Sequence, residues 1–410
     1  MISIGTVTGA HGGLAHALLP GAAIGQGVRL RNAEREITGT VTAVQLGRAM
    51  IALHADIQGI AAGDSIVTDP AACCFPLGTA LLGRAVDADG TAIDGGPAID
   101  ARPRRARIFA PGVNERVAVT KPFWTGVRVI DGLFTIGRGA RIGIFGAPGA
   151  GKSTLLQMMC TAQAADAVVV GLIGERGREA EEWLRAIGPH LTVVCATSDR
   201  PAAVRVRAAR FAMAQADALR ARGLDVLLIV DSLARYANAL REIAVAANES
   251  VGRGGYPPSV FSDLASFVEG AGASRAGSVT LVATVLSDGD DRDPVSDAAR
   301  SLLDGHLELT APLARKGRYP AIDVCAGTSR TMSAVVSARH LDDAAVVKAA
   351  VSSLQASEDA RALGLMPSSA RALRAVAAED AIESFLCQGK QPTDRAATLS
   401  ALAALADRLR

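Results

Sequence analysis

A glycine-rich loop between an apolar run and a helix-like segment constrains this chain more than any other feature. Residues 141–145 are short, apolar and β-prone, and they are followed by Gly146, Ala147, Pro148, Gly149, Ala150, Gly151, Lys152, Ser153 and Thr154. Glycines let successive backbone N–H groups surround a phosphate, which a Cβ would obstruct. The helix that follows directs its positive dipole end at the same phosphate. The G-x-x-x-x-G-K-S spacing in this context predicts a nucleoside triphosphate site.

Two acidic residues that follow apolar runs extend this prediction to hydrolysis. Lys152 is expected to reach the β- and γ-phosphates of ATP, and the Ser153 hydroxyl to bind Mg²⁺. Asp231 follows the run 226–230 and fits a carboxylate that holds Mg²⁺ through its water shell. By itself, Asp231 could equally cap the helix expected at 232–247. Glu175 follows the run 167–173 and could orient the attacking water.

Composition limits the compartment and the partners. A chain of 410 residues is long enough for about two or three domains. Its net charge of +2 gives no bulk attraction to nucleic acid or anionic membrane. The six cysteines form no C-x-x-C pair, and no run approaches the roughly 18 apolar residues of a membrane span. The start of the chain lacks the pattern of a signal peptide. We therefore expect a cytoplasmic protein whose membrane contact, if any, is peripheral.

The pattern of apolar residues changes along the chain. Residues 1–72 contain short β-prone pieces at 4–8, 27–31, 36–44, 49–53 and 65–68, which predict a small β-barrel. Residues 69–103 read as connective. From about residue 120 to 335, strands at 141–145, 167–173, 191–196, 226–230, 279–286 and 306–309 alternate with helices near 152–165, 178–187, 201–222 and 232–247. This alternation predicts an α/β fold with a mostly parallel sheet covered on both faces.

An ordered series of short strings resembles one family. They lie at 125–133, 141–154, 174–179, 231–237, 255–261, 300–306, 318–324 and 328–330. Together they resemble the hexameric ATPases of type III protein secretion, in the injectisome and flagellar export branches, which are related to the catalytic β subunit of rotary ATP synthase. The resemblance implies a RecA-like P-loop NTPase core, with a β-barrel at 1–72, the ATPase domain at 73–338 and a C-terminal helical domain at 339–410.

The resemblance also implies roles for individual residues. Glu175 matches the catalytic carboxylate, and Arg176 and Arg235 match residues that line the phosphate pocket. Arg330 matches the position from which a neighbouring subunit projects an arginine finger. Tyr319 matches an adenine-stacking position of the rotary β subunit, although a tyrosine packed between the sheet and the C-terminal helices would explain it equally well.

For the whole protein, the resemblance implies an ATPase that couples ATP hydrolysis to chaperone release, substrate unfolding and export. The implied assembly is a homohexamer at the cytoplasmic face of the inner membrane. Its implied partners are stator and stalk proteins, the export gate and chaperone–effector complexes, and no nucleic acid. In the family, the loop that matches 256–258 faces the central pore.

The chain also departs from the family pattern. The acidic loop 288–294 is slightly shorter, and no longer N-terminal extension precedes the barrel, which favours an injectisome over a flagellum. Residues 341–410 match poorly apart from 381–388, so their helices could be a structural lid rather than a surface for chaperones.

Three other functions compete with this prediction. A rotary synthase catalytic subunit would share the chemistry, but the strings at 256–261 and 304–306 favour the secretion branch. A Rho-like RNA helicase is disfavoured because residues 1–72 lack the interleaved aromatic and basic residues that bind single-stranded RNA. A non-catalytic regulatory subunit is disfavoured by the presence of Glu175.

Overall fold

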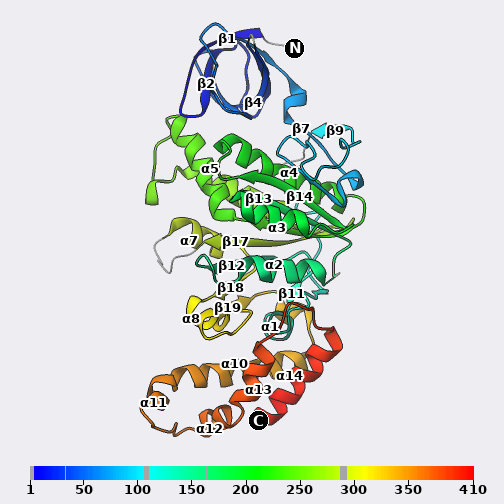
Figure 1. The fold of residues 1–410 in the computed structure, drawn as a ribbon, viewed down its shortest axis with the longest axis vertical. Helices are drawn as coiled ribbons and strands as arrows, with labels where there is room; N and C mark the ends of the chain where they lie inside the picture. The colour runs from blue at the N-terminus through cyan, green and yellow to red at the C-terminus, as the bar shows by residue number, and fades with distance from the viewer. Residues whose placement is uncertain (1–3, 33, 106–109, 163, 287–292) are drawn as a thin grey trace.

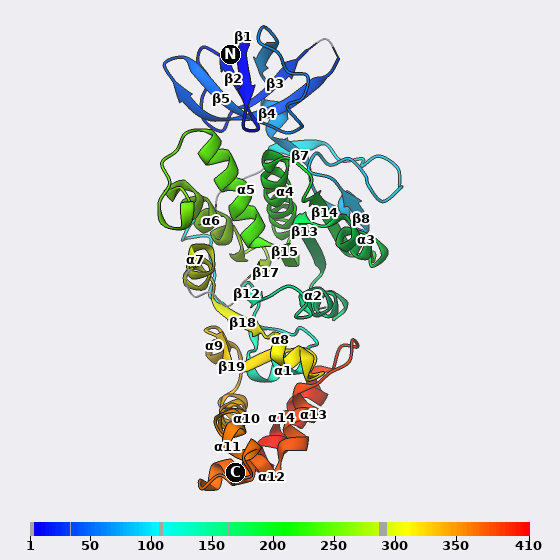
Figure 2. The same cartoon turned by 60° about the vertical axis from the view of Figure 1, so that its left-hand side comes forward.

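The computed structural model describes residues 4–32, 34–105, 110–162, 164–286 and 293–410. The molecule is elongated, with a barrel at one end, a sheet with helices in the middle and a group of helices at the other end (Figures 1 and 2). The acidic loop predicted at 288–294 lies largely outside the described residues.

The N-terminal segment forms a closed six-stranded barrel. Its strand order is β1-β2-β5-β4-β3-β6, and the strands are β1 (Ile4–His11), β2 (Leu14–Leu18), β3 (Gly27–Arg31), β4 (Glu36–Gln45), β5 (Arg48–Leu53) and β6 (Ser65–Thr68). Alternate residues of β4 are buried, as one face of a strand requires. The predicted barrel is therefore confirmed, although β2 was not expected from the sequence.

The middle of the molecule is built on a large sheet of order β19-β18-β12-β17-β15-β13-β14-β8. The strands are β8 (Arg84–Val86), β12 (Arg141–Gly146), β13 (Ala167–Glu175), β14 (Leu191–Thr197), β15 (Asp225–Asp231), β17 (Ser278–Leu286), β18 (Gly305–Leu309) and β19 (Ile322–Ser329). All neighbouring pairs are parallel except β18 and β19, which are antiparallel. The segment 69–103 is not purely connective, because it contributes the edge strand β8.

Helices cover both faces of this sheet. One face packs against α2 (Lys152–Thr161) and α3 (Gly177–Arg185). The other face packs against α4 (Ala202–Arg220), α5 (Leu233–Ala246), α6 (Pro258–Gly270) and α7 (Pro294–Leu302). Alternate residues of the central strands enter two separate cores, with Val168 and Val170 on one face and Val169 on the other. This explains why these strands are apolar through most of their length.

The C-terminal helices share a core with the α2 face of the sheet. They are α10 (Ala338–Ala356), α11 (Glu358–Ala362), α12 (Ala370–Ala377), α13 (Glu379–Leu386) and α14 (Arg395–Leu409). Helix α1 (Arg128–Leu133) lies against them, and Ile130, Ile382 and Leu402 belong to one buried cluster. No helix in the described part of the chain is long and apolar enough to cross a membrane.

Smaller elements complete the described structure. They are β7 (Cys74–Pro76), β9 (Pro103–Arg105), β10 (Pro122–Phe123), β11 (Ile136–Gly137), β16 (Gly272–Ala273), α8 (Ala311–Arg315), α9 (Met332–Val335) and three 3₁₀ turns at Pro70–Cys73, Thr79–Leu81 and Arg253–Gly255.

A buried histidine lies where the barrel meets the sheet layer. His54 is 7% exposed, and its ring nitrogens lie 3.0 Å from the hydroxyls of Thr38 and Thr40. Burial, together with the cationic side chains of Arg207 and Arg210 on α4, lowers the pKa of His54 to about 3. The imidazole is therefore neutral in the folded chain at neutral pH.

The free energy of unfolding should consequently fall as the pH drops from about 6.5 to about 3. Unfolded His54 binds a proton with its ordinary pKa, whereas the folded chain rejects that proton, so acid favours unfolding by up to ~1.4 kcal/mol per pH unit. Denaturant titrations across this range should show a smaller pH slope for His54→Gln than for the natural chain. His16→Gln, in the same barrel but less buried, is the control. Identical slopes for His54→Gln and the natural chain would contradict this account.

Candidate functional site

The predicted phosphate loop connects the end of β12 to the start of α2. Gly146 ends the strand with a φ of 152°, and a Cβ there would lie 2.6 Å from the carbonyl oxygen of Leu309. Gly149 and Gly151 have φ values of 81° and 93°, in the left-handed region that glycine adopts without strain. Helix α2 begins at Lys152, so the first-turn N–H groups of α2 face the loop.

Lys152 folds back over the loop that precedes it. Its Nζ donates hydrogen bonds to the carbonyl oxygens of Gly146, at 2.7 Å, and Ala147, at 2.8 Å. Its charge also acts on Asp231, where it works to lower the pKa of that carboxyl group. The ammonium group is therefore bonded to the loop, and its charge reaches the carboxyl group that ends β15.

Asp231 ends β15 and is 7% exposed. Its Oδ1 accepts a hydrogen bond of 2.5 Å from the hydroxyl of Thr284, on the neighbouring strand β17. Burial raises the pKa of Asp231, against the opposing effects of Thr284 and Lys152. Ser232 caps α5, because its hydroxyl accepts a hydrogen bond from the N–H of Arg235. The cap role considered for Asp231 is thus filled by its neighbour.

Glu175 ends β13 beside Asp231 and is 5% exposed. Burial raises the pKa of Glu175 above its ordinary value, and the nearby carboxyl groups of Asp231 and Glu179 raise it further. Arg235 on α5 opposes this shift: its Nε lies 3.0 Å from Glu175 Oε1, as an ion pair without hydrogen-bond geometry. Arg235 also donates to the carbonyl oxygen of Gly174. The structure thus brings Glu175 and Asp231, at the carboxyl ends of β13 and β15, together with Arg235 from α5.

The residues near the loop fit a Mg²⁺ ion that is bound together with nucleotide. In the described ranges, no group of three or more His, Cys, Asp or Glu side chains is arranged to hold a metal ion by itself. Mg²⁺ is usually bound by one or two protein oxygens together with phosphate oxygens and water. The Ser153 hydroxyl and the Asp231 carboxylate are oxygen ligands of this kind. A cation would also relieve the repulsion between Asp231 and Glu175.

Tyr319 lies against the phosphate loop. A Cβ on Gly151 would be 3.7 Å from two carbon atoms of the Tyr319 ring, and the Tyr319 side chain is half exposed. The backbone of Tyr319 is held from the C-terminal segment, since its carbonyl oxygen accepts a 2.8 Å hydrogen bond from the N–H of Gln388. The side chain of Gln388 also bonds Gly126 and Arg128, at the start of α1. The exposed ring is therefore available beside the loop.

Two of the predicted site residues do not meet the others. Arg176 is exposed at the start of α3, and within the described residues no hydrogen bond or ion pair of its side chain occurs. Arg330 is exposed and follows the last residue of β19. Strand β19 begins beside the end of β18, with Ile322 opposite Leu309, and runs back until Ser329 lies opposite Gly305. Because Leu309 is level with Gly146, Arg330 lies at the sheet edge opposite its own phosphate loop.

The structure adds three residues that the sequence reasoning did not single out. Thr284 lies within the apolar strand β17, where β-branched residues are common, so the sequence did not mark it as a site residue. Glu179 lies in the first turn of α3, and its carboxyl group raises the pKa of Glu175. Gln388 lies in the string 381–388 that matches the family, but nothing in the sequence connects it to Tyr319. The roles predicted from the sequence for the individual site residues stay proposals.

Comparison with known proteins supports a single family. Residues 126–329 match the model for the ATP synthase alpha/beta family, nucleotide-binding domain. A flagellum-specific ATP synthase of Treponema pallidum is 40% identical over 400 residues, covering 95% of this chain and 89% of the relative. The SPI-2 type 3 secretion system ATPase of Salmonella typhimurium is 41% identical over 341 residues, covering 82% of this chain and 78% of the relative.

A solved structure resembles the whole chain. The assembled ATPase EscN of the enteropathogenic Escherichia coli type III secretion system superposes with a TM-score of 0.92 at 35% identity, covering 98% of this chain and 100% of that one. EscN in complex with its central stalk EscO gives a TM-score of 0.88 over the same shares of both chains. This chain therefore belongs to the family of type III secretion and flagellum-specific ATPases, within the wider ATP synthase alpha/beta family.

Proposed function

We propose that this chain is the ATPase of a type III protein secretion apparatus and that it works as a ring of identical subunits. The observation that carries the proposal is the separation of two sets of residues in one chain. Lys152, Asp231 and Glu175 gather at one edge of the sheet, whereas Arg330 lies at the opposite edge. In such a ring, the edge with the phosphate loop of one subunit faces the edge with Arg330 of the next. Each site is then completed by Arg330 from a neighbour.

In the proposed reaction, water attacks the γ-phosphate of ATP held by the loop 146–154, the bond from the γ-phosphorus to the β–γ bridging oxygen breaks, and ADP leaves. Glu175 orients the water, and its raised pKa suits a group that accepts a proton during the attack. Lys152 turns from the loop carbonyls to the phosphates and offsets their negative charge. Arg235, at the side of the pocket, also offsets this charge. Mg²⁺, held through Ser153 and Asp231, would neutralise charge on the phosphate oxygens. Arg176 is exposed near this pocket and is proposed to line it once nucleotide is bound.

The assembly and its partners extend the proposal. EscN has been solved both assembled and with its central stalk EscO. By analogy we propose a homohexamer with a central stalk protein, which meets a stator, the export gate and chaperone–effector complexes at the cytoplasmic face of the inner membrane. The barrel 1–72, the ATPase domain 73–338 and the helical domain 339–410 are the proposed units, with hydrolysis driving chaperone release, unfolding and export.

The catalytic role of Glu175 can be tested by Glu175→Gln. This variant should bind ATP with nearly the natural affinity but lose ATP turnover by about 10²-fold or more, because the amide cannot accept a proton. Nucleotide binding measured by fluorescence and phosphate release measured at saturating ATP would separate the two effects. Near-normal turnover would exclude Glu175 from the reaction.

The trans role of Arg330 can be tested by Arg330→Ala. Turnover should fall by about 10³-fold, the usual effect of losing an arginine finger. Lys152→Ala should also be inactive, because it lacks the phosphate-binding ammonium. Mixing the two variants should restore part of the activity, since the intact loop of one can receive Arg330 from the other. If native mass measurements show mixed rings and no activity returns, Arg330 does not act across the interface.

The contact between Tyr319 and the phosphate loop predicts an effect on ATP affinity. Tyr319→Ala should raise the KM for ATP by about tenfold, because base–aromatic stacking contributes ~1–3 kcal/mol. Tyr319→Phe keeps the ring and should leave the KM nearly unchanged. Steady-state kinetics of both variants test this, and an unchanged KM in Tyr319→Ala would assign Tyr319 a packing role instead.

A further inference from the structure

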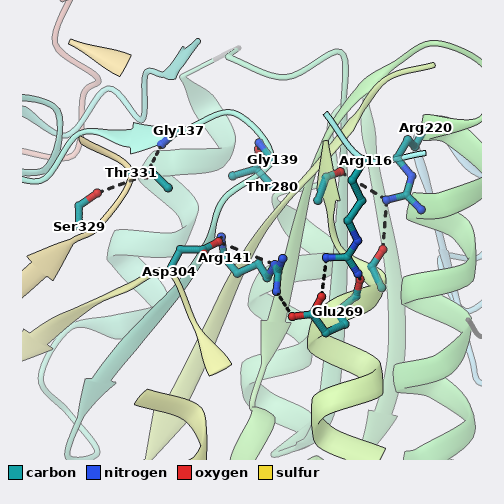
Figure 3. Close-up of polar contacts among 12 residues, drawn as sticks. Arg116, Gly137, Gly139, Arg141, Arg220, Glu269, Thr280, Asp304, Ser329 and Thr331 are labelled. Carbon is teal, nitrogen blue, oxygen red and sulfur yellow. Dashed lines mark hydrogen bonds and ion pairs between the residues drawn. The ribbon is translucent and has the colours of Figure 1, made fainter. Parts of the chain in front are cut away.

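The backbone around Arg330 is anchored on both sides of the arginine. The Ser329 hydroxyl donates a 2.9 Å hydrogen bond to the carbonyl oxygen of Thr135. The Thr331 hydroxyl accepts a 3.0 Å hydrogen bond from the N–H of Gly137 (Figure 3). Between them, the N–H of Arg330 donates a 2.9 Å hydrogen bond to the carbonyl oxygen of Asp304. Residues 329–331 are therefore fixed, while the Arg330 side chain remains exposed.

Asp304 connects this anchor to the start of the phosphate-loop strand. Its Oδ2 accepts a 2.9 Å hydrogen bond from the N–H of Arg141, the first residue of β12, and its own N–H donates 2.7 Å to the carbonyl oxygen of Arg141. Gly305, the next residue, permits the close approach of β19. A Cβ there would lie 2.4 Å from the carbonyl oxygen of Thr328 and 3.0 Å from Ser329 Cα.

The Arg141 side chain extends the connection to helix α6. Its Nη1 donates a hydrogen bond to Glu269, and its Nε forms a 3.8 Å ion pair with Asp304 (Figure 3). Glu269, in the last turn of α6, also accepts a 2.5 Å hydrogen bond from Arg116. Burial works to raise the pKa of Glu269, but the two arginines outweigh it and hold the pKa below its ordinary value. Glu269 is therefore a charged link between α6 and Arg141.

We propose that Asp304, Arg141 and Glu269 are positioning residues for Arg330, and that they set its placement in the neighbouring subunit's site. This inference rests on the proposed trans role of Arg330. Asp304 fixes the backbone of the arginine, and Arg141 and Glu269 fix Asp304 relative to α6. Reaction rates depend steeply on the placement of charged groups, and an exposed arginine has no packing of its own to hold it. The strings 300–306 and 141–145 thus gain a role that phosphate binding does not explain.

The effect of losing Asp304 should appear in turnover rather than in nucleotide binding. Asp304→Ala removes the acceptor for Arg141 and the charge beside its guanidinium, so kcat should fall by about tenfold or more while the KM for ATP changes little. Asp304→Asn keeps an acceptor oxygen and should recover part of the loss. Glu269→Ala, at the other end of the connection, should lower kcat in the same direction.

Asp94→Ala is the matched control. Asp94 also accepts backbone hydrogen bonds and pairs with an arginine, Arg84, at 2.8 Å, but it lies beside β8 at the far end of the sheet from β19. It should keep the natural kcat. Thermal unfolding and native mass measurements on each variant would show that the rings are intact.

Mixed rings separate positioning in trans from a local defect. Asp304→Ala subunits mixed with Lys152→Ala subunits should regain activity, because an intact loop then receives a correctly placed Arg330 from its neighbour. Natural kcat in both Asp304→Ala and Glu269→Ala would overturn the inference. So would a failure of Asp304→Ala to be rescued in mixtures where Arg330→Ala is rescued. If Arg330→Ala itself keeps activity, the proposed trans role fails instead.

Discussion

The register of the parallel sheet is the constraint on which the rest of this structure depends. Parallel pairing of β12, β17, β15 and β13 brings the phosphate loop, Thr284, Asp231 and Glu175 to a single edge. The antiparallel strand β19 then carries the chain back to the other edge, where Arg330 lies. If Arg330 acts on a neighbouring subunit as proposed, a single chain holds both parts of a site at positions that it cannot bring together by itself.

The buried carboxyl groups at the phosphate-loop edge of the sheet are consistent with a site that binds cations. Asp231 and Glu175 are both buried, and each has a pKa raised above its ordinary value by burial. Thr284, Lys152 and Arg235 only partly compensate for this cost. Buried like charges are uncommon unless a function retains them. Bound Mg²⁺ and a neighbour's arginine would bring positive charge to a region that the isolated chain leaves short of it.

Sequence patterns predicted the parts of the fold that depend on residues close together in the chain. The strands 141–145 and 226–230 and the loop between 146 and 154 were found because apolar runs, glycines and a following helix lie side by side in the chain. Strand β19 was missed because most of its residues are partly or fully exposed and it carries no long apolar run. The bond between Thr284 and Asp231 joins residues 53 positions apart, so no local pattern reveals it. The opposite placement of Arg330 likewise depends on strand pairing, which the sequence alone does not specify.

In the proposed ring, two neighbouring subunits together form each catalytic site. The most direct measurement is ATP turnover per chain over a range of protein concentrations, with the assembled fraction determined by native mass on the same samples. Turnover should follow the fraction of chains in rings, and isolated subunits should bind ATP without hydrolysing it. If isolated subunits hydrolyse ATP at the same rate per chain as assembled rings, the site is complete within one chain.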